Sequence, residues 1–173
     1  PEDINADIVV AAGYKWLAGS LGAALAYLSP GILEMLASRL GSNLWPIVPS
    51  TQSYVSMHTL ASSMAWMQRV GLPEIRERTL VAADAVRRFG AEAGWIPLGG
   101  GGDKTSGIVS FSFPAPEANR IVAEARRSGV HVSARGAAIR ISPHFSVSVD
   151  ECRDAVGLLK TISSTSQKTG REK

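Results

Sequence analysis

A lysine at position 15 stands where the sequence could carry out covalent chemistry. It follows a run of five small apolar residues, 8–12, and lies between Tyr14 and Trp16. An unbroken apolar run of this length predicts a strand covered on both faces, as in the sheet of an α/β protein. Ligands bind at the carboxyl ends of such strands, where a desolvated lysine is a nucleophile. The alternative is that Lys15 extends its amine to water, as most strand-end lysines do.

A second candidate is Arg140, which lies within the short apolar run 138–141. Burying an unpaired charge in an apolar strand costs free energy. The planar guanidinium makes two parallel, charge-assisted hydrogen bonds to a carboxylate, so we expect Arg140 to bind a substrate carboxylate. The alternative is that strand alternation simply points its side chain to solvent. Arg135, in a predicted turn beside Gly136, is a weaker candidate for the same task.

The segment around the lysine resembles a known motif. Gly13-Tyr-Lys-Trp-Leu-Ala-Gly19, followed by Gly22, resembles the cofactor-lysine segment of class V aminotransferases. These are fold-type I enzymes that use pyridoxal 5'-phosphate (PLP). The resemblance implies that Lys15 is catalytic and holds PLP as a Schiff base. Residues 22–24 read Gly-Ala-Ala where the family usually has Gly-Thr-Gly, so the threonine hydroxyl is missing at this point.

A second segment supports the same family. Arg135–Phe145, leading into Asp150 and Glu151, resembles the C-terminal block of class V aminotransferases. The two motifs stand in the family's order, and the resemblance extends over residues 7–159. It implies that Arg140 grips the carboxylate of an amino-acid substrate.

The irregular, proline-containing segment 41–53 is predicted to be a functional loop. Its Ser50-Thr51 pair stands where the family has Gly-Thr, whose threonine reaches the PLP phosphate of the neighbouring subunit. The resemblance therefore implies that Thr51 binds the cofactor and that the protein is a homodimer. The alternative is that Thr51 only caps the helix that follows.

Composition excludes several classes of protein. Of the 173 residues, 45% are hydrophobic and 19% are charged. This composition is typical of a globular rather than a disordered chain. The net charge of +3 is slight, and the basic pairs 87–88 and 126–127 fall in predicted helices, so we expect no nucleic-acid partner.

The single cysteine, Cys152, excludes an internal disulfide and fits a reducing cytoplasm. The apolar stretch 11–28 contains Lys15 and several glycines, so we expect no membrane span. No metal site is expected, because His58 lacks an acidic or histidine neighbour at helical spacing.

Hydrophobic periodicity and capping residues predict the elements that position these side chains. A second buried strand is expected over 22–28, and a helix begins at Ser29-Pro30 and ends at Gly41. The remaining predicted elements are helices over 54–70, 74–93, 117–128 and 149–162 and strands over 108–113, 130–133 and 138–141. The last helix is expected to bury Cys152, Val156 and Leu159, and the glycines 99–102 are interpreted as a surface loop.

The predicted fold class is α/β: the C-terminal part of a fold-type I PLP-dependent transferase. Residues 1–70 are expected to form the end of the large PLP-binding domain, with its sheet, the cofactor lysine and a connecting loop and helix. Residues 71–163 are expected to form a bridging helix and a small C-terminal α/β domain, and residues 164–173 a flexible tail.

The resemblance predicts a PLP-dependent enzyme that acts on an amino acid. The family residues that contact the pyridinium nitrogen and stack on the ring would precede Pro1, so we expect this chain alone to bind PLP poorly. Two alternatives stay open: a cofactor-free dimerising or binding remnant, and a cysteine desulfurase-like lyase. The latter is disfavoured because residues 130–140 contain no cysteine and Cys152 lies beyond Arg140. The sequence does not choose between transamination, epimerisation and lyase chemistry.

Overall fold

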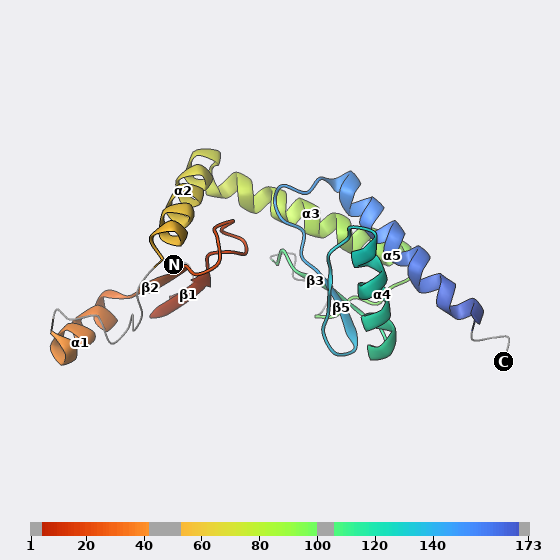
Figure 1. Ribbon diagram of the computed structural model, residues 1–173, viewed down its shortest axis with the longest axis horizontal. Coiled ribbons are helices and arrows are strands. Elements are labelled where there is room, and N and C mark those ends of the chain that lie inside the picture. Colours follow the sequence, from red (N-terminus) through yellow and green to blue (C-terminus); the bar gives the residue numbers. More distant parts are fainter. Residues whose placement is uncertain (1–4, 42–52, 100–105, 170–173) are drawn as a thin grey trace. The chain divides into compact units, whose positions relative to one another are not determined.

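The computed structural model describes residues 5–41, 53–99 and 106–169. The chain divides into two compact units, Pro1–Gly71 and Leu72–Lys173. The first unit contains β1, β2, α1 and α2, and the second contains α3, β3, α4, β4, β5 and α5 (Figure 1). Each unit is described by itself below.

The first unit is built on a two-stranded antiparallel sheet. Strand β1 (Ile8–Ala12) pairs with β2 (Ala24–Leu28), and the register runs from Ile8↔Leu28 to Ala12↔Ala24. Both predicted strands are therefore confirmed, with β2 shorter at its start. The prediction that they are buried on both faces is wrong, because 55% of Ile8 and 70% of Val10 are exposed. The two strands pair only with each other, so within the described residues no wider sheet shields them.

Helix α1 (Pro30–Leu40) begins and ends where its capping residues predict. The Ser29 hydroxyl accepts a hydrogen bond from the Ile32 amide at 3.4 Å and donates one to Asp7 Oδ1 at 2.9 Å. The cap therefore ties the helix to the start of β1. None of the side chains of α1 is buried within the described part of the chain.

Helix α2 (Tyr54–Val70) occupies the predicted range. Its N-cap is Ser53, whose hydroxyl accepts a hydrogen bond from the Ser56 amide at 3.3 Å. The alternative that Thr51 caps this helix is therefore wrong, and Thr51 itself lies outside the described residues. Leu60 and Met67 are buried on one face of α2.

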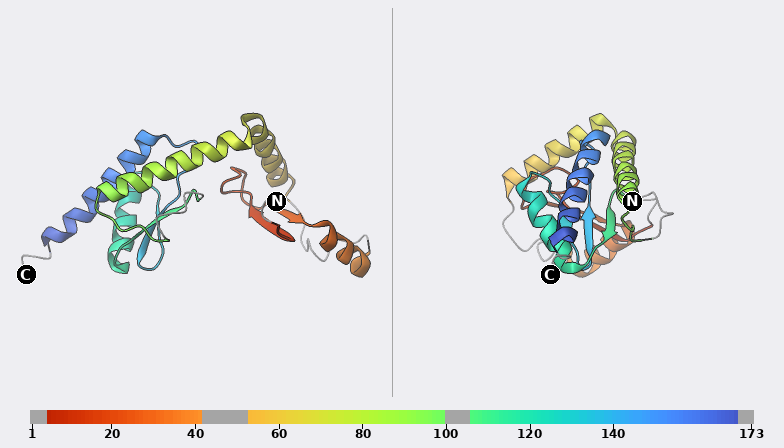
Figure 2. Two further views of the ribbon diagram at one scale, coloured as in Figure 1. Left: turned by 180° about the vertical axis from the view of Figure 1, so that it is seen from behind. Right: turned by 90° about the vertical axis from the view of Figure 1, so that its right-hand side faces the viewer.

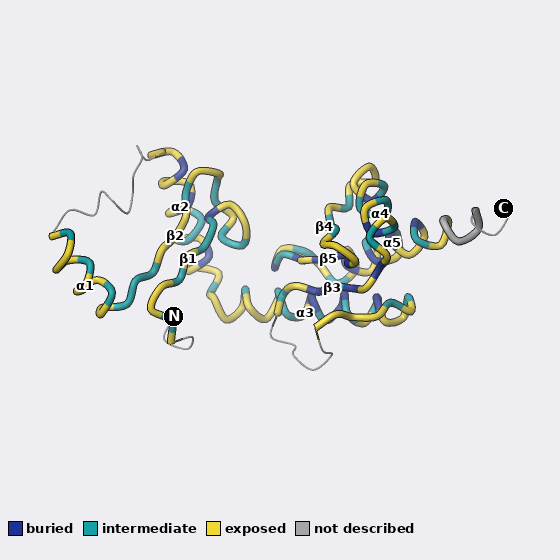
Figure 3. The backbone as a smooth tube through the Cα atoms, turned by 90° about the horizontal axis from the view of Figure 1, so that it is seen from below, coloured by how far each residue is buried: buried dark blue, intermediate teal, exposed yellow. Residues whose placement is uncertain are grey.

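The second unit is a three-stranded antiparallel sheet covered on one face by three helices. The strand order is β3 (Val109–Ser112), β5 (Ala138–Ile141), β4 (Ser133–Ala134). The helices are α3 (Leu72–Glu92), α4 (Ala115–Arg127) and α5 (Val149–Thr169) (Figure 2). Alternate residues of β3 and β5 point to the helices and fill the core. Phe111, Ile121, Ile139 and Leu159 are almost completely buried there, and each contributes about 1.5–3 kcal/mol of burial free energy. Figure 3 colours buried segments of β3 and β5 dark blue.

Several boundaries in this unit differ from the sequence predictions. Helix α4 begins at Ala115 rather than 117, and the strand predicted over 130–133 is reduced to Ser133–Ala134. Helix α3 begins at Leu72 rather than 74, because proline at position 73 is tolerated in a first helical turn. Helix α5 continues to Thr169, so the predicted end at 162 is too early, and residues 164–169 of the predicted tail are helical. The hydroxyls of Ser164 and Thr165 each donate to a helix carbonyl four residues earlier. These polar residues therefore extend the helix without adding a buried face.

None of the helices in the described ranges is both long and apolar enough to cross a lipid bilayer.

Candidate active site

Lys15 lies in a tight turn that follows β1 directly. Three backbone hydrogen bonds close this turn: Gly13 N to Ala23 O at 3.0 Å, Ala18 N to Lys15 O at 2.9 Å, and Gly19 N to Gly13 O at 2.8 Å. The backbone of Lys15 is therefore held at the carboxyl end of the strand. We call residues 13–19 the lysine turn.

The small residues of the lysine turn are required by its geometry. A β-carbon at Gly13 would lie 2.7 Å from the Ala23 carbonyl oxygen, which is closer than real contacts allow. A β-carbon at Gly19 would lie 3.1 Å from the Gly13 carbonyl oxygen. Ala18 has a φ of 50°, a left-handed conformation that residues with a side chain seldom adopt. The glycine spacing around the lysine therefore has a physical cause in this backbone path.

Two serines of α2 hold the residues that follow the lysine. The Ser63 hydroxyl donates to the Leu17 carbonyl at 2.6 Å, and the Ser56 hydroxyl donates to the Leu21 carbonyl at 2.7 Å. Sequence reasoning missed this pair. Their spacing of seven residues places both hydroxyls on one face of a helix, which is a signal that could have found them.

The side chain of Lys15 is exposed. Its Nζ lies 5.4 Å from the centre of the Tyr14 ring, within the range of a cation–π contact. The expectation of a desolvated lysine is wrong for the described chain. The reason is that β1 pairs only with β2, so the residues around the lysine turn lack the layers that cover such a position in a larger sheet.

Arg140 lies in β5, the central strand of the second unit. Ile139 and Ile141 are buried in the core, so alternation places Arg140 on the opposite face of the sheet. The residue is half-buried. Its Nε atom is buried and has no hydrogen-bond partner among the described residues. A buried, unpartnered guanidinium nitrogen is consistent with a site that a ligand or a nearby side chain completes.

The other predicted site residues fall in different places. Arg135 is exposed in the β4–β5 turn, where its amide donates to the Ala138 carbonyl at 2.8 Å. Thr51 lies outside the described residues. Lys15 belongs to the first unit and Arg140 to the second, and the structure describes each within its own unit. Among the described residues, no group of three or more His, Cys, Asp or Glu side chains is placed to bind a metal ion.

Cys152 is buried in α5, as predicted. Burial raises the pKa of its thiol, and the nearby charge of Glu151 raises it further. The thiolate is the nucleophilic form of cysteine, so this environment makes Cys152 a packing residue rather than a reactive one.

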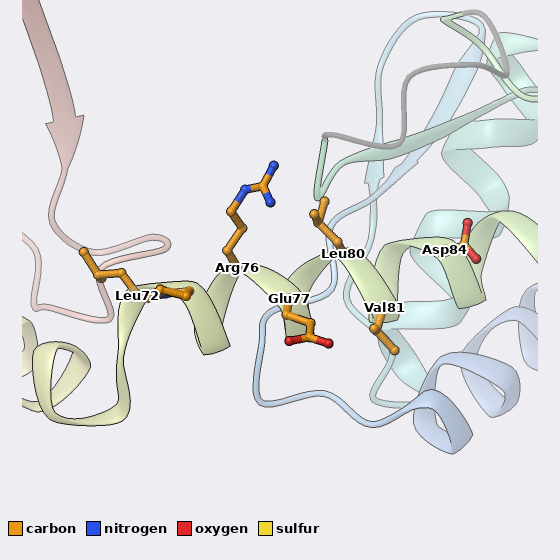
Figure 4. Close-up of a pocket in the computed structure, with 7 residues that line it drawn as sticks. Leu72, Arg76, Glu77, Leu80, Val81 and Asp84 are labelled. Carbon is orange, nitrogen blue, oxygen red and sulfur yellow. The ribbon is translucent and has the colours of Figure 1, made fainter. Parts of the chain in front are cut away.

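A shallow hollow of about 760 Å³ lies along α3 in the second unit. All of its lining residues belong to that helix: Leu72, Pro73, Arg76, Glu77, Leu80, Val81 and Asp84. Figure 4 shows Arg76 and Leu80 extending from one side of α3 and Glu77 and Val81 from the other. The hollow is therefore the surface of one helix, and it contains neither of the candidate site residues.

No protein-family model matches the chain, and no curated protein matches it by sequence. Its structure is similar to an apo cysteine desulfurase from Thermococcus onnurineus NA1, with a TM-score of 0.76 at 16% identity over 95% of this chain and 48% of that one. It is similar to 8-amino-7-oxononanoate synthase from Francisella tularensis, with a TM-score of 0.66 at 17% identity over 92% and 46%. It is also similar to serine palmitoyltransferase with a PLP internal aldimine, with a TM-score of 0.70 at 18% identity over 92% and 40%.

These similarities show the fold. The chain has the α/β fold of the C-terminal part of fold-type I PLP-dependent enzymes. It spans less than half the length of the three structures named above.

Proposed function

We propose that the chain is the C-terminal portion of a PLP-dependent enzyme of the class V aminotransferase type, and that Lys15 holds the cofactor. One observation carries the proposal: the lysine turn fixes Lys15 at the end of β1 by three backbone hydrogen bonds. The turn belongs to a chain with the fold of the C-terminal part of PLP-dependent enzymes. The residue types of the turn agree with the family motif that the sequence resembles.

The residues present fit a cofactor that reacts with an amino acid. Lys15 supplies a primary amine on a rigid backbone, and the lysine turn lies against Leu60 of α2. Arg140 supplies a guanidinium on the open face of its sheet, with Nε buried and unpartnered. Thr51 is proposed to donate to the cofactor phosphate, on the family resemblance alone. PLP, when bound, supplies an electron sink for the negative charge that develops at the substrate α-carbon.

The chain's own residues would perform two tasks in this reaction. Arg140 binds the substrate carboxylate through parallel charge-assisted hydrogen bonds and so fixes the orientation of the α-carbon. Lys15, in its neutral form, removes the α-proton and holds it at Nζ as a general base. Tyr14 lies beside the amine. We propose that the remainder of a homodimeric, cytoplasmic enzyme covers the lysine turn and excludes water from it, because Lys15 is exposed in this chain.

The test is the visible absorption of the full-length protein with PLP. We expect wild-type protein to show the absorption band of lysine-bound PLP and its spectrum to change when its amino-acid substrate is added. Lys15→Ala should not form the band. Lys160→Ala is the matched control, since Lys160 is an exposed lysine on α5, and it should behave as wild type. A Lys15→Ala protein that keeps the band would overturn the assignment.

The second candidate is a cofactor-free binding module. The observation that favours it is the exposed apolar surface of the first unit, where Val10, Leu21 and Tyr54 are 70%, 72% and 83% exposed. If these side chains form one patch, it would bind another protein surface whether or not a cofactor is present. Cysteine desulfurase chemistry fits the chain less well, because the only cysteine is buried and its thiol pKa is raised.

A further inference from the structure

The Nε atom of Arg140 is an unusual donor. The atom lies on the face of the sheet that the helices do not cover. It is nevertheless buried, and no described residue accepts its hydrogen bond. Buried guanidinium nitrogens normally have an acceptor. The residue as a whole is only half-buried, so part of the side chain remains accessible while Nε is not. If an acceptor for Nε comes from the protein itself, the two terminal nitrogens are left to bind a ligand.

Two serines lie directly across from Arg140 on the neighbouring strands. Ser110 of β3 and Ser133 of β4 are its register partners, and both are half-buried. Because opposite residues of paired strands share one face, both hydroxyls lie on the same side of the sheet as the guanidinium.

The backbone hydrogen-bond pattern of the sheet indicates which of the two serines lies nearer to Arg140. The Phe113 amide donates to the Ala137 carbonyl at 3.0 Å, so these two residues form a hydrogen-bonded pair. Hydrogen-bonded and non-hydrogen-bonded pairs alternate along an antiparallel ladder. Ser110 and Arg140 consequently form a non-hydrogen-bonded pair. Its Cα atoms approach to about 4.5 Å and its side chains are close together. The Leu98 amide donates to the Ser110 carbonyl at 2.9 Å, which confirms that the Ser110 backbone bonds away from β5.

Ser133 lies farther from Arg140 than Ser110 does. The Arg135 amide donates to the Ala138 carbonyl, so Ser133 and Arg140 fall in a hydrogen-bonded pair. Cα atoms in such pairs are about 5.5 Å apart. Ser110 is thus the hydroxyl best placed to reach the guanidinium.

We propose that Ser110 is a positioning residue for Arg140. Its hydroxyl oxygen accepts the Nε–H bond after rotation about χ1, which has three staggered positions. This bond fixes the plane of the guanidinium and directs its two terminal nitrogens to the substrate carboxylate. The inference rests on the proposed function only in taking that ligand to be a carboxylate, and the bond between Ser110 and Nε can be tested without any ligand.

The experiment follows hydrogen exchange at Nε of Arg140 by nitrogen-15 NMR of the full chain. Arg140→Lys assigns the signal. Sodium acetate is then titrated as the carboxylate probe. We expect Ser110→Ala to accelerate Nε exchange and to weaken acetate binding by about fivefold to tenfold, the effect of one lost hydrogen bond. Ser110→Thr keeps the hydroxyl and should restore both values.

Two control variants separate a positioning role from a structural one. Ser112 lies on the same strand and the same face but pairs with Ala138, so Ser112→Ala should leave exchange and acetate binding unchanged. Ser133→Ala tests the more distant hydroxyl and should have the smaller effect. Equal effects of Ser110→Ala and Ser112→Ala would overturn the proposal. If acetate does not perturb Arg140 in the wild type but Ser110→Ala still accelerates exchange, the carboxylate role fails and the positioning contact stands.

Discussion

At position 13 the chain has no room for a β-carbon, and this fact ties one residue to the proposed chemistry. The contact that forbids it is a backbone carbonyl, that of Ala23, rather than a flexible side chain. The strand pair cannot move aside without breaking the hydrogen bond between Gly13 and Ala23. Gly13 therefore fixes the path by which the backbone reaches Lys15.

Gly13→Ala should destabilise the first unit by about 1–3 kcal/mol, the usual cost of overpacking, and should displace the lysine turn. Hydrogen exchange of the β1 amides measures the change. Gly31→Ala is the matched control. A β-carbon there has no neighbour within 4 Å, so we expect it to be neutral or to stabilise by about 0.4–1 kcal/mol. Equal effects of the two substitutions would contradict this account of the turn.

At the scale of elements, the fit of α3 against β3 depends on another glycine. A β-carbon at Gly90 would overlap three atoms of the Phe111 ring. Phe111 is completely buried and makes an edge-on contact with Trp95, with ring centres 5.3 Å apart. The helix approaches the sheet closely because position 90 has no side chain.

Gly90→Ala should therefore destabilise the second unit by about 1–3 kcal/mol, since the Phe111 ring must leave its place in a close-packed core. Urea unfolding followed by Trp95 fluorescence, in a background that lacks the other tryptophans, measures the loss. Gly157→Ala, with nothing within 4 Å of its β-carbon, should stabilise α5 by about 0.5–1 kcal/mol. A stable Gly90→Ala variant with an unchanged Trp95 signal would show that the helix does not approach as described.

Helix α5 begins with a reciprocal cap. Glu151 accepts hydrogen bonds from the amide and hydroxyl of Ser148, both at 2.8 Å, and the Glu151 amide donates to the Ser148 hydroxyl at 3.2 Å. The backbone hydrogen bond from Ser148 lowers the pKa of Glu151 below its usual 4.5, and the hydroxyl lowers it further. Because the folded-state pKa is lowered, the stabilisation is present above 4.5 and is lost as pH falls through the folded pKa.

Comparing wild type with Glu151→Gln tests this linkage. Wild type should be the more stable at about pH 7, and the difference should be smaller at a low pH that approaches the lowered pKa of the carboxylate. Ser148→Ala should cost about 1 kcal/mol at neutral pH. Thermal unfolding at the two pH values is the measurement. A difference that stays constant with pH would contradict the capping role.

Local signals explain how much of these elements the sequence predicted. The caps at Ser29 and Gly41 and the periodicity of α2 depend on neighbouring residues, so their positions could be predicted. Burial of β1 depends on what lies beside the strand in space, and an apolar run carries no information about that. The end of α5 was missed because its last turns have no stop signal, only residues without an apolar face.

The residues of the candidate site likewise fall into those that local sequence signals predicted and those that depend on the fold. Residue type and motif pointed to Lys15 and Arg140, and the structure gives each a defined backbone setting. The hydroxyls of Ser56 and Ser63 were missed because only their seven-residue spacing marks them, and that of Ser110 was missed because its neighbours depend on strand register.

At the scale of the whole molecule, the two units differ in how much they bury. The second has a large apolar core, whereas in the described part of the first only Ser56, Leu60 and Met67 have buried side chains. Segments with few buried contacts open at low free energy. In this chain alone, amides of β1 and β2 should therefore exchange hydrogen faster than those of β3 and β5. Mass spectrometry of deuterium uptake measures this, and equal protection of β1 and β5 would contradict it.

The proposal that Lys15 holds the cofactor is tested most directly by chemical trapping in the full-length protein. The PLP-loaded protein is reduced with borohydride, digested, and mapped for the lysine that carries the phosphopyridoxyl group. We expect the label on Lys15, with Lys160, another exposed lysine, essentially unlabelled. A label shared evenly between the two lysines, or one that persists elsewhere in Lys15→Ala at the wild-type level, would contradict it.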